Sequence, residues 1–448
     1  MELFVLMVVS QGWWRTYDGG GNDWSYSVCV DDSDNVIVAG NSYSNSSTGI
    51  DGHIWKYDPN GTLLWHVAIP SPGSEWLRGV DTDDNGNIYV VMTDYSYDEI
   101  RVLKYDLSGG FRWNYSFSPN PNALYEGTSI CVDGNMVFAT GYENDTLADT
   151  VSLVLLYIDT TGTLVRSVFW SGRGTLFGAD AYGHAVAVTP SGNPVVGGQR
   201  VDYPNSNYKA MLVEFSRSDG SEVRRREIDY GSTREVVEDI DIAASGDLLV
   251  VIRLETTPKS AYVGRYTSTF SSVWQRSIQS PSARRSLYGV AIGPDDTVLV
   301  AGLWENTAGN RDFWLRKYTW TGSQVWDTLI DHTPGTDDWA EECAWDSHGY
   351  VIASGGTTPS NQDMLVYKLP IQQVYNPEPS DKNALSAFPN PFKSSFQISG
   401  GKAPFALYDA TGRLVLRTDN ATGLGRGLEP GVYFLQDAAG RRIRLVKR

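Results

Sequence analysis

Acidic and aromatic residues recur side by side along the chain, and together they offer groups that bind sugars or peptides. Aromatic planes stack on sugar rings, and carboxylates accept hydrogen bonds from hydroxyl groups. Such pairs include Asp23-Trp24 and Glu75-Trp76, whereas Arg284-Arg285 breaks the pattern and indicates an anionic partner. The alternative is that the repeat itself requires the pairs for turns and packing. The candidate binding rim consists of the aromatic and basic members of these segments: Trp24, Trp76, Tyr125, Tyr182, Arg284, Arg285 and Trp339.

Known catalytic motifs are absent from the sequence. The five histidines, at positions 53, 66, 184, 332 and 348, form no HExxH pair, and the chain has no GxSxG elbow, GxxxxGKS loop or CxxC pair. We interpret the isolated histidines as loop or hairpin residues. The sequence therefore predicts no catalytic residue and favours a protein that is not an enzyme.

Metal chemistry has only partial support. Asp81, Asp83, Asn85 and Gly86 resemble the first half of a calcium-binding loop, but the twelfth position is Met92 instead of a bidentate Glu. The stretch coincides with a turn between two expected strands, which is the interpretation that we favour. The sequence thus predicts no cofactor, with calcium left open. Neither a disulfide framework nor a zinc site is indicated by three cysteines without a close pair: Cys29, Cys131 and Cys343.

The elements that would position these residues recur with a period of about 52 residues. A short alternating strand is centred on positions 28, 80, 130, 186, 240, 290 and 343, at spacings of 50 to 56 residues. A polar turn and three further strands follow each of the first six centres, and the fourth strand often holds a tryptophan such as Trp65. Four antiparallel strands form one propeller blade, and stacking blades around an axis buries their faces. The period predicts an all-β fold, a seven-bladed β-propeller over residues 13–370.

The two ends of the repeat array predict how the ring closes. The seventh unit ends after its third strand at Tyr367-Lys368-Leu369, whereas the chain opens with an isolated strand, Trp13-Trp14-Arg15-Thr16-Tyr17. An unpaired sheet edge is a liability that closure removes. We therefore expect the N-terminal strand to complete the seventh blade.

The repeats resemble those of bacterial β-propeller proteins of the secreted and surface classes. The resemblance rests on segments such as Asp51-Gly-His-Ile-Trp-Lys-Tyr-Asp-Pro-Asn-Gly-Thr-Leu-Leu-Trp65 and covers roughly residues 13 to 370. It implies the fold and leaves the function open, because such repeats occur in proteins of many roles.

After a polar, proline-containing linker over residues 371–386, residues 387–448 contain five strand-like segments that predict a small β-sandwich. This region resembles the C-terminal (type A) sorting domain of type IX secretion cargo, with an FPNPF segment at 388–392, a YDATGRLV segment at 408–415, an LEPGVYF segment at 428–434 and a basic end. The resemblance implies contact with the secretion machinery; a plain accessory sandwich is the alternative. It places the sorting signal on eight residues: Pro389, Asn390, Pro391, Gly412, Arg413, Gly431, Tyr433 and Lys447.

Charge and the N-terminus agree with export. The formal net charge is −17, which disfavours nucleic acid and anionic membrane surfaces, and the basic residues concentrate after position 386. Residues 1–12 hold a seven-residue apolar run, far too short to span a bilayer, followed by small residues at a cleavage-like site. We expect a signal peptide truncated at its start, with an ordinary strand as the alternative. The expected location is extracellular or on the outer-membrane surface.

Taken together, the sequence predicts a secreted or cell-surface binding module with a monomeric propeller and a glycan or surface-protein ligand. An extracellular hydrolase or lyase acting on a polymer is the alternative function, and a structural surface-layer component is the third. The enzyme requires a few unlike side chains to converge at one end of the propeller axis.

Overall fold

The computed structural model describes most of the chain, and the account below concerns that part. The described residues are 12–370 and 386–447. Within these ranges, the following short segments are excluded: 44–48, 70–72, 172–178, 203–206, 233, 257–259, 280–283, 294–295, 307–308, 389–396, 400–401, 410–412, 421–423, 425–427, 430 and 439–441. The expected signal peptide, except Gly12, and residues 371–385 of the expected linker lie outside the described residues. Among the described residues, no helix is both long and apolar enough to cross a membrane.

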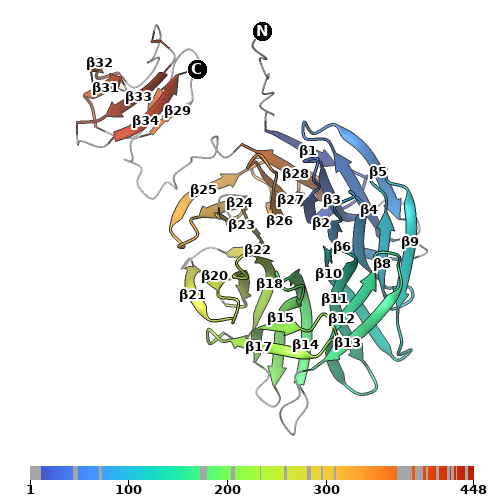
Figure 1. Ribbon diagram of the computed structural model, residues 1–448. Coiled ribbons are helices and arrows are strands. Elements are labelled where there is room, and N and C mark those ends of the chain that lie inside the picture. The colour runs from blue at the N-terminus through green and yellow to red at the C-terminus, as the bar shows by residue number, and fades with distance from the viewer. Residues whose placement is uncertain are drawn as a thin grey trace, which may run out of the picture. The chain divides into compact units, whose positions relative to one another are not determined.

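Seven four-stranded antiparallel sheets are arranged as blades around a central axis, which confirms the all-β propeller (Figure 1). The innermost strands are β2 (Asp23–Val30), β6 (Glu75–Thr82), β10 (Ala123–Asp133), β14 (Ala179–Val188), β18 (Glu235–Ile242), β22 (Arg285–Ile292) and β26 (Asp338–Trp345). The second strands are β3 (Val36–Ser42), β7 (Ile88–Asp94), β11 (Met136–Asp145), β15 (Pro194–Asp202), β19 (Leu248–Leu254), β23 (Val298–Glu305) and β27 (Val351–Thr357).

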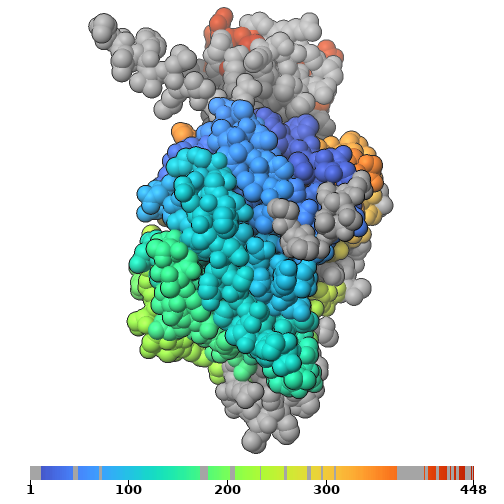
Figure 2. Space-filling model, turned by 90° about the vertical axis from the view of Figure 1, so that its right-hand side faces the viewer, coloured from blue at the N-terminus to red at the C-terminus, as the bar shows by residue number. Residues whose placement is uncertain are grey.

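The outer half of each blade completes the sheet. The third strands are β4 (Asp51–Tyr57), β8 (Glu99–Tyr105), β12 (Thr150–Asp159), β16 (Tyr208–Phe215), β20 (Ser260–Tyr266), β24 (Arg311–Tyr318) and β28 (Asp363–Leu369). The outermost strands are β5 (Leu63–Ile69), β9 (Phe111–Phe117), β13 (Leu164–Trp170), β17 (Glu222–Ile228), β21 (Ser272–Ile278), β25 (Gln324–Ile330) and β1 (Trp13–Tyr17). Successive blades lie side by side along the rim in chain order (Figure 2).

Burial follows the position of a strand within its blade. The second strand is covered on both faces by neighbouring blades, so β3 and β7 are buried at every position, and each begins with a continuous apolar run. The outermost strands β5 and β9 instead alternate between exposed and partly buried residues. The core therefore lies between the blades, and a blade cannot bury it alone.

The ring closes through β1, as predicted. β1 pairs antiparallel with β28, from Trp13 opposite Lys368 to Tyr17 opposite Met364, and becomes the fourth strand of the seventh blade. The two ends of the propeller chain thus share one sheet, and closure removes an exposed edge.

In several blades, a tryptophan on the fourth strand packs against a hairpin glycine of the next blade. Trp13 lies against Gly61 in the hairpin of the following blade, where a Cβ atom would come within 2.6 Å of the ring. The Trp13 Nε1 donates a 3.0 Å hydrogen bond to the Pro59 carbonyl of the same hairpin. Gly61 has a φ of 81°, so the position requires glycine for both conformation and space. The same contact joins three further pairs: Trp65 with Gly109, Trp113 with Gly162 and Trp274 with Gly322.

The C-terminal unit, Tyr375–Arg448, folds separately from the first unit, Met1–Val374. It contains a two-stranded sheet and a four-stranded sheet in the order β32-β31-β33-β34. Their strands are β29 (Ser386–Phe388), β30 (Gln397–Ser399), β31 (Phe405–Asp409), β32 (Leu414–Thr418), β33 (Gly431–Gln436) and β34 (Arg442–Lys447).

Four of the expected sorting residues are described. Tyr433 is buried and its hydroxyl donates a 2.7 Å hydrogen bond to the Glu429 carbonyl. Arg413 forms an exposed ion pair with Asp409, Gly431 begins β33 and Lys447 ends β34. The other four lie outside the described residues: Pro389, Asn390, Pro391 and Gly412.

Truncating Trp13 tests the closure. We expect Trp13→Ala to lower the free energy of unfolding by about 3 kcal/mol or more, because it removes a buried indole and leaves a cavity against Gly61. Trp14→Ala is the matched control: it lies on the same strand with its side chain 52% exposed, so its loss should stay below about 1 kcal/mol. Urea unfolding followed by circular dichroism measures both, and equal losses would contradict the closing role of Trp13.

The closing strand also packs on a pair of neutral histidines. Tyr17 contacts the rings of His53 and His66, whose centroids lie 5.7 and 5.3 Å away. The His53 Nδ1 and His66 Nε2 atoms are 2.7 Å apart, so one ring must donate and the other accept. Burial lowers the pKa of His53 to about 4, with a contribution from the charge of His66, and burial also lowers the pKa of His66.

These lowered pKa values predict that acid weakens the closure. The unfolded chain takes up protons near pH 6.5 while folded His53 stays neutral, so stability should fall as the pH drops from about 6.5 toward 4. His53→Asn removes one titrating ring, so its stability should depend less on pH over that range. Thermal unfolding between pH 7 and pH 4.5 measures the difference, and parallel curves for the two proteins would refute the linkage.

Candidate functional site

Each innermost strand contains a β-bulge at the same place. In β2 the register with β3 shifts between Ser25 and Ser27, which leaves Tyr26 as the extra residue. The extra residue of a bulge points out of the regular alternation, a device that re-aims side chains near binding sites. The seven extra residues, which we call the bulge ring, all line one cavity of about 840 Å³ along the axis: Tyr26, Arg78, Thr128, His184, Glu238, Tyr288 and Glu341.

The bulge ring was missed by the sequence analysis, although a signal for it exists. Each member stands two residues before the centre of its repeat, so aligning the repeats by their centres would have brought the seven positions together. The residue types at this position differ from blade to blade, whereas the centres themselves are apolar. Unlike side chains thus converge within the channel, whereas the enzyme alternative requires such a convergence at one end of the propeller axis.

A smaller pocket of about 310 Å³, here called the vestibule, adjoins the channel where the innermost strands begin. It shares Tyr26, Arg284, Tyr288 and Glu341 with the channel cavity. Its full lining is strongly aromatic: Trp24, Tyr26, Trp76, Arg284, Tyr288, Leu303, Arg311, Trp339, Glu341 and Gln362.

Four of the candidate rim residues meet in the vestibule, namely Trp24, Trp76, Arg284 and Trp339. The Trp24 and Trp76 ring centroids lie 5.6 Å apart although the residues belong to neighbouring blades. Trp24 and Trp76 occupy the same position of their own innermost strands. Because the side chains of a strand alternate between its two faces, both tryptophans point to the same side of their blades.

The other three candidates lie outside the vestibule lining. Tyr125 is buried between blades, where its hydroxyl donates a 2.6 Å hydrogen bond to Glu143. Arg285 stacks on Trp304, with the guanidinium carbon 3.2 Å from the ring centroid, and Tyr182 packs edge-on against Tyr142. Tyr125 and Arg285 occupy the strand position before that of the vestibule tryptophans, so strand alternation turns them the other way.

The acidic partners of the tryptophans serve the fold. Asp23 is fully buried and accepts a hydrogen bond from the Gly19 backbone amide, and Asp338 accepts one from His332. Burial raises the pKa of both carboxyls. Asp23 and Asp338 therefore anchor the incoming loops, while Trp24 and Trp339 line the vestibule. The burial of these two carboxyls agrees with the packing explanation.

Two arginines line the channel without an ion pair among the described residues. The Arg78 guanidinium lies over Tyr26 and Trp76, 4.2 and 4.7 Å from their ring centroids. Arg284 donates a 3.2 Å hydrogen bond from Nη2 to the Tyr288 hydroxyl, and its Nε is buried without a hydrogen-bond partner in the described part of the chain.

The acidic members of the bulge ring add little negative charge near these arginines. Glu238 forms an ion pair with Arg253. Burial raises the pKa of Glu341 to about 8, and the charge of Glu238 contributes, so Glu341 is mostly protonated at pH 7. Burial also lowers the pKa of His184 to about 4, which leaves that ring neutral.

C-terminal to the bulge on the innermost strands, acidic side chains accept hydrogen bonds from the backbone of the next blade. Asp81 accepts a 2.7 Å hydrogen bond from the Val132 amide, and Asp239 accepts one of the same length from Val290. Burial raises the pKa of Asp81 to about 6 and that of Asp239 to about 7. Asp83 instead accepts hydrogen bonds within its own turn, so it bonds apart from Asp81, in agreement with the turn interpretation of this stretch.

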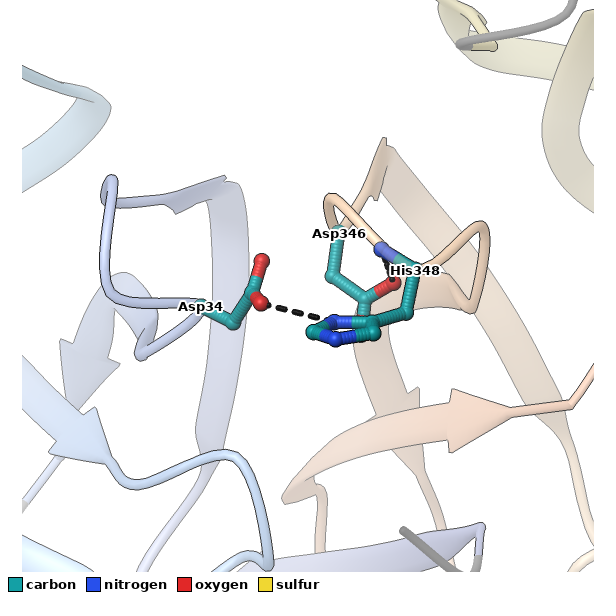
Figure 3. Close-up of side chains that lie close together, drawn as sticks. All are labelled: Asp34, Asp346 and His348. Carbon is teal, nitrogen blue, oxygen red and sulfur yellow. Dashed lines mark hydrogen bonds and ion pairs between the residues drawn. The ribbon is translucent and has the colours of Figure 1, made fainter. Parts of the chain in front are cut away.

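A candidate metal group lies at the junction of the first and seventh blades, where Asp34, Asp346 and His348 point toward one another (Figure 3). Their oxygen and nitrogen atoms already have protein partners. Asp346 forms a buried 2.7 Å ion pair with Lys368, and Asp34 lies 2.9 Å from the His348 Nδ1. Asp34 also accepts hydrogen bonds from the Ser347 backbone and hydroxyl. The group therefore acts as a bridge between blades. A second acidic group consists of Asp18, Asp23 and Asp363.

Comparison with known proteins supports the fold but does not assign a family or a function. No protein-family model matches the chain. A WD40 domain of Pan2 from Neurospora crassa has a similar structure, with a TM-score of 0.50 and 10% identity over 82% of this chain and 98% of that domain. The fold is a WD40-like β-propeller.

Two weaker similarities complete the comparison. A protein of unknown function from Dyadobacter fermentans has a TM-score of 0.47 and 8% identity over 80% of this chain and 98% of that one. An uncharacterized WD repeat-containing protein of Acanthamoeba polyphaga mimivirus is 27% identical over 115 residues, which is 20% of this chain. The chain matches only 8% of the length of that relative.

The bridge at Asp34 predicts a metal-independent effect. We expect Asp34→Ala to lower the free energy of unfolding by about 1–3 kcal/mol, because it leaves the Ser347 groups unpaired. The loss should be the same with and without EDTA, as measured by thermal unfolding. If EDTA destabilises the natural protein but not the variant, a metal ion holds this junction instead.

Proposed function

We propose that this protein is a secreted or cell-surface interaction module whose vestibule and bulge ring bind a ligand. The observation that carries the proposal is the convergence of unlike side chains in the bulge ring and in the aromatic vestibule that adjoins it. Pockets of roughly 300–1,000 Å³ with aromatic walls and a few polar groups are typical of ligand sites. The vestibule, at about 310 Å³, lies at the small end of that range.

The proposed location rests on sequence alone. The apolar run expected to be a signal peptide and the resemblance of residues 387–448 to a type IX sorting domain support export to the outer-membrane surface or beyond. The C-terminal unit would then contact the secretion machinery while a monomeric propeller carries the binding site. The four-stranded sheet of that unit is compatible with a sorting domain and equally with an accessory sandwich.

An extracellular hydrolase or lyase is the second candidate. One observation favours it: Glu238 is paired with Arg253, while burial keeps Glu341 protonated near neutral pH. A carboxyl group that burial keeps protonated near neutral pH can act as a general acid. The binding module is preferred because the described channel residues include no nucleophile oriented by a base.

The proposal predicts that aromatic side chains of the vestibule control binding. Screened on glycan and peptide arrays, Trp24→Ala and Trp76→Ala should each weaken a specific signal about tenfold or more, as truncation of an aromatic anchor does. Trp14→Ala is the control, because Trp14 is exposed and outside the vestibule lining.

The same samples separate the competing functions. Equal loss in all three variants would show that the signal is unspecific, and a blank array with folded protein would overturn the binding proposal. Release of new chain ends from an arrayed polysaccharide, lost in Glu341→Ala, would favour the enzyme.

A further inference from the structure

The vestibule combines flat aromatic walls with Arg284, which has no ion pair among the described residues. Trp24 and Trp76 come from neighbouring blades, and Tyr26, Tyr288 and Trp339 complete the aromatic lining. A saccharide ring presents an apolar face for stacking and an edge of hydroxyl groups. An acidic amino acid side chain has no such face, so these walls favour a sugar ring over an acidic peptide.

The charge of the site is opposite to that of the whole chain. The chain carries a net charge of −17, yet Arg78 and Arg284 face the channel without ion pairs among the described residues. Two nearby carboxyls add little negative charge: Glu238 is paired with Arg253, and Glu341 is mostly protonated at pH 7. An arginine left without a carboxylate is a ready partner for an anion, since its planar guanidinium matches a carboxylate with two hydrogen bonds.

Glu126 also lines the channel and lies near Arg78. Burial raises the pKa of Tyr95 and Tyr142, the charge of Glu126 raises both further, and the charge of Arg78 lowers both. Arg311 lies beside Asp337, 3.5 Å from the carboxylate, and so is paired. The cationic character of the site therefore comes from Arg78 and Arg284.

We infer that the vestibule binds an acidic saccharide, with a uronate ring stacked on the tryptophans and its carboxylate held by Arg284 of the vestibule and by Arg78 of the adjoining channel cavity. This inference rests on the proposed function and names the ligand class of the same site. Stacking on Tyr26 and Trp76 already orients the Arg78 guanidinium, so little conformational freedom is lost when an anion binds.

Calorimetry of the full chain with matched saccharides tests the inference. The probes are a trimer of galacturonic acid and the neutral galactose trimer, each at 50 and 500 mM NaCl. We expect the acidic trimer to bind at least tenfold more tightly at low salt, and the difference to shrink at high salt. Arg284→Gln should abolish most of the preference for the acidic trimer.

Arg285→Gln is the matched control, because Arg285 is adjacent in sequence but stacks on Trp304 outside the vestibule lining. It should keep the preference for the acidic trimer. A preference lost equally in both variants would show that general surface charge is responsible and would overturn the inference.

The remaining outcomes separate this inference from the proposed function. Equal affinity for the two trimers, lost in Trp76→Ala, would overturn the acidic class while the vestibule stands as a binding site. A hexaglutamate peptide or a mononucleotide binding more tightly than the acidic trimer would overturn the saccharide. Absence of binding to every probe, together with blank arrays, would overturn both proposals.

Discussion

Contact between adjacent blades is the interaction on which the rest of this structure depends. No blade can bury its own faces, so the apolar runs of the second strands are useful only when another blade covers them. The tryptophan of one blade seated on the hairpin glycine of the next repeats this contact at the outer edge. Trp13 makes it for the seventh blade from the opposite end of the chain, so the closing junction is built like the others rather than by a special device.

Closure in turn creates the channel and its chemistry. Seven innermost strands meet around one axis, and their apolar centres face the neighbouring blades. Carboxylates such as Asp81 and Asp239 bond to the backbone of the next blade, which satisfies buried amide groups around the channel. The bulge then adds one residue per strand whose side chain is required neither for packing against the neighbouring blade nor for bonding to its backbone. This is why the unlike side chains gather at the bulge and not along the rest of the strand.

The sequence predicted the repeat, the number of blades and the role of β1, because all three follow from the spacing of apolar strands and from counting strands at the two ends. It predicted Trp24, Trp76, Trp339 and Arg284 as candidate site residues, and these meet in the vestibule. It placed acidic and aromatic neighbours on one rim, whereas strand alternation sends them to opposite faces. A bulge is a backbone irregularity without a residue signature of its own, so its ring was invisible until strands were paired.

Asymmetry within a symmetric ring has a direct consequence for recognition. A channel lined by seven equivalent residues would offer a ligand seven equivalent poses, and no pose would be selected. Around the bulge ring in chain order, Thr128 and His184 separate Arg78 from Glu238, whereas only Tyr26 separates Arg78 from Glu341. Because Glu238 is paired with Arg253 and Glu341 holds its proton, the field of the ring is uneven. An anion would therefore find one preferred side, and the aromatic vestibule lies on the side of Tyr26, Tyr288 and Glu341, where the propeller closes. Ring closure and ligand recognition thus depend on the same part of the propeller. A substitution that weakens the pairing of β1 with β28 should therefore lower ligand affinity as well as the free energy of unfolding.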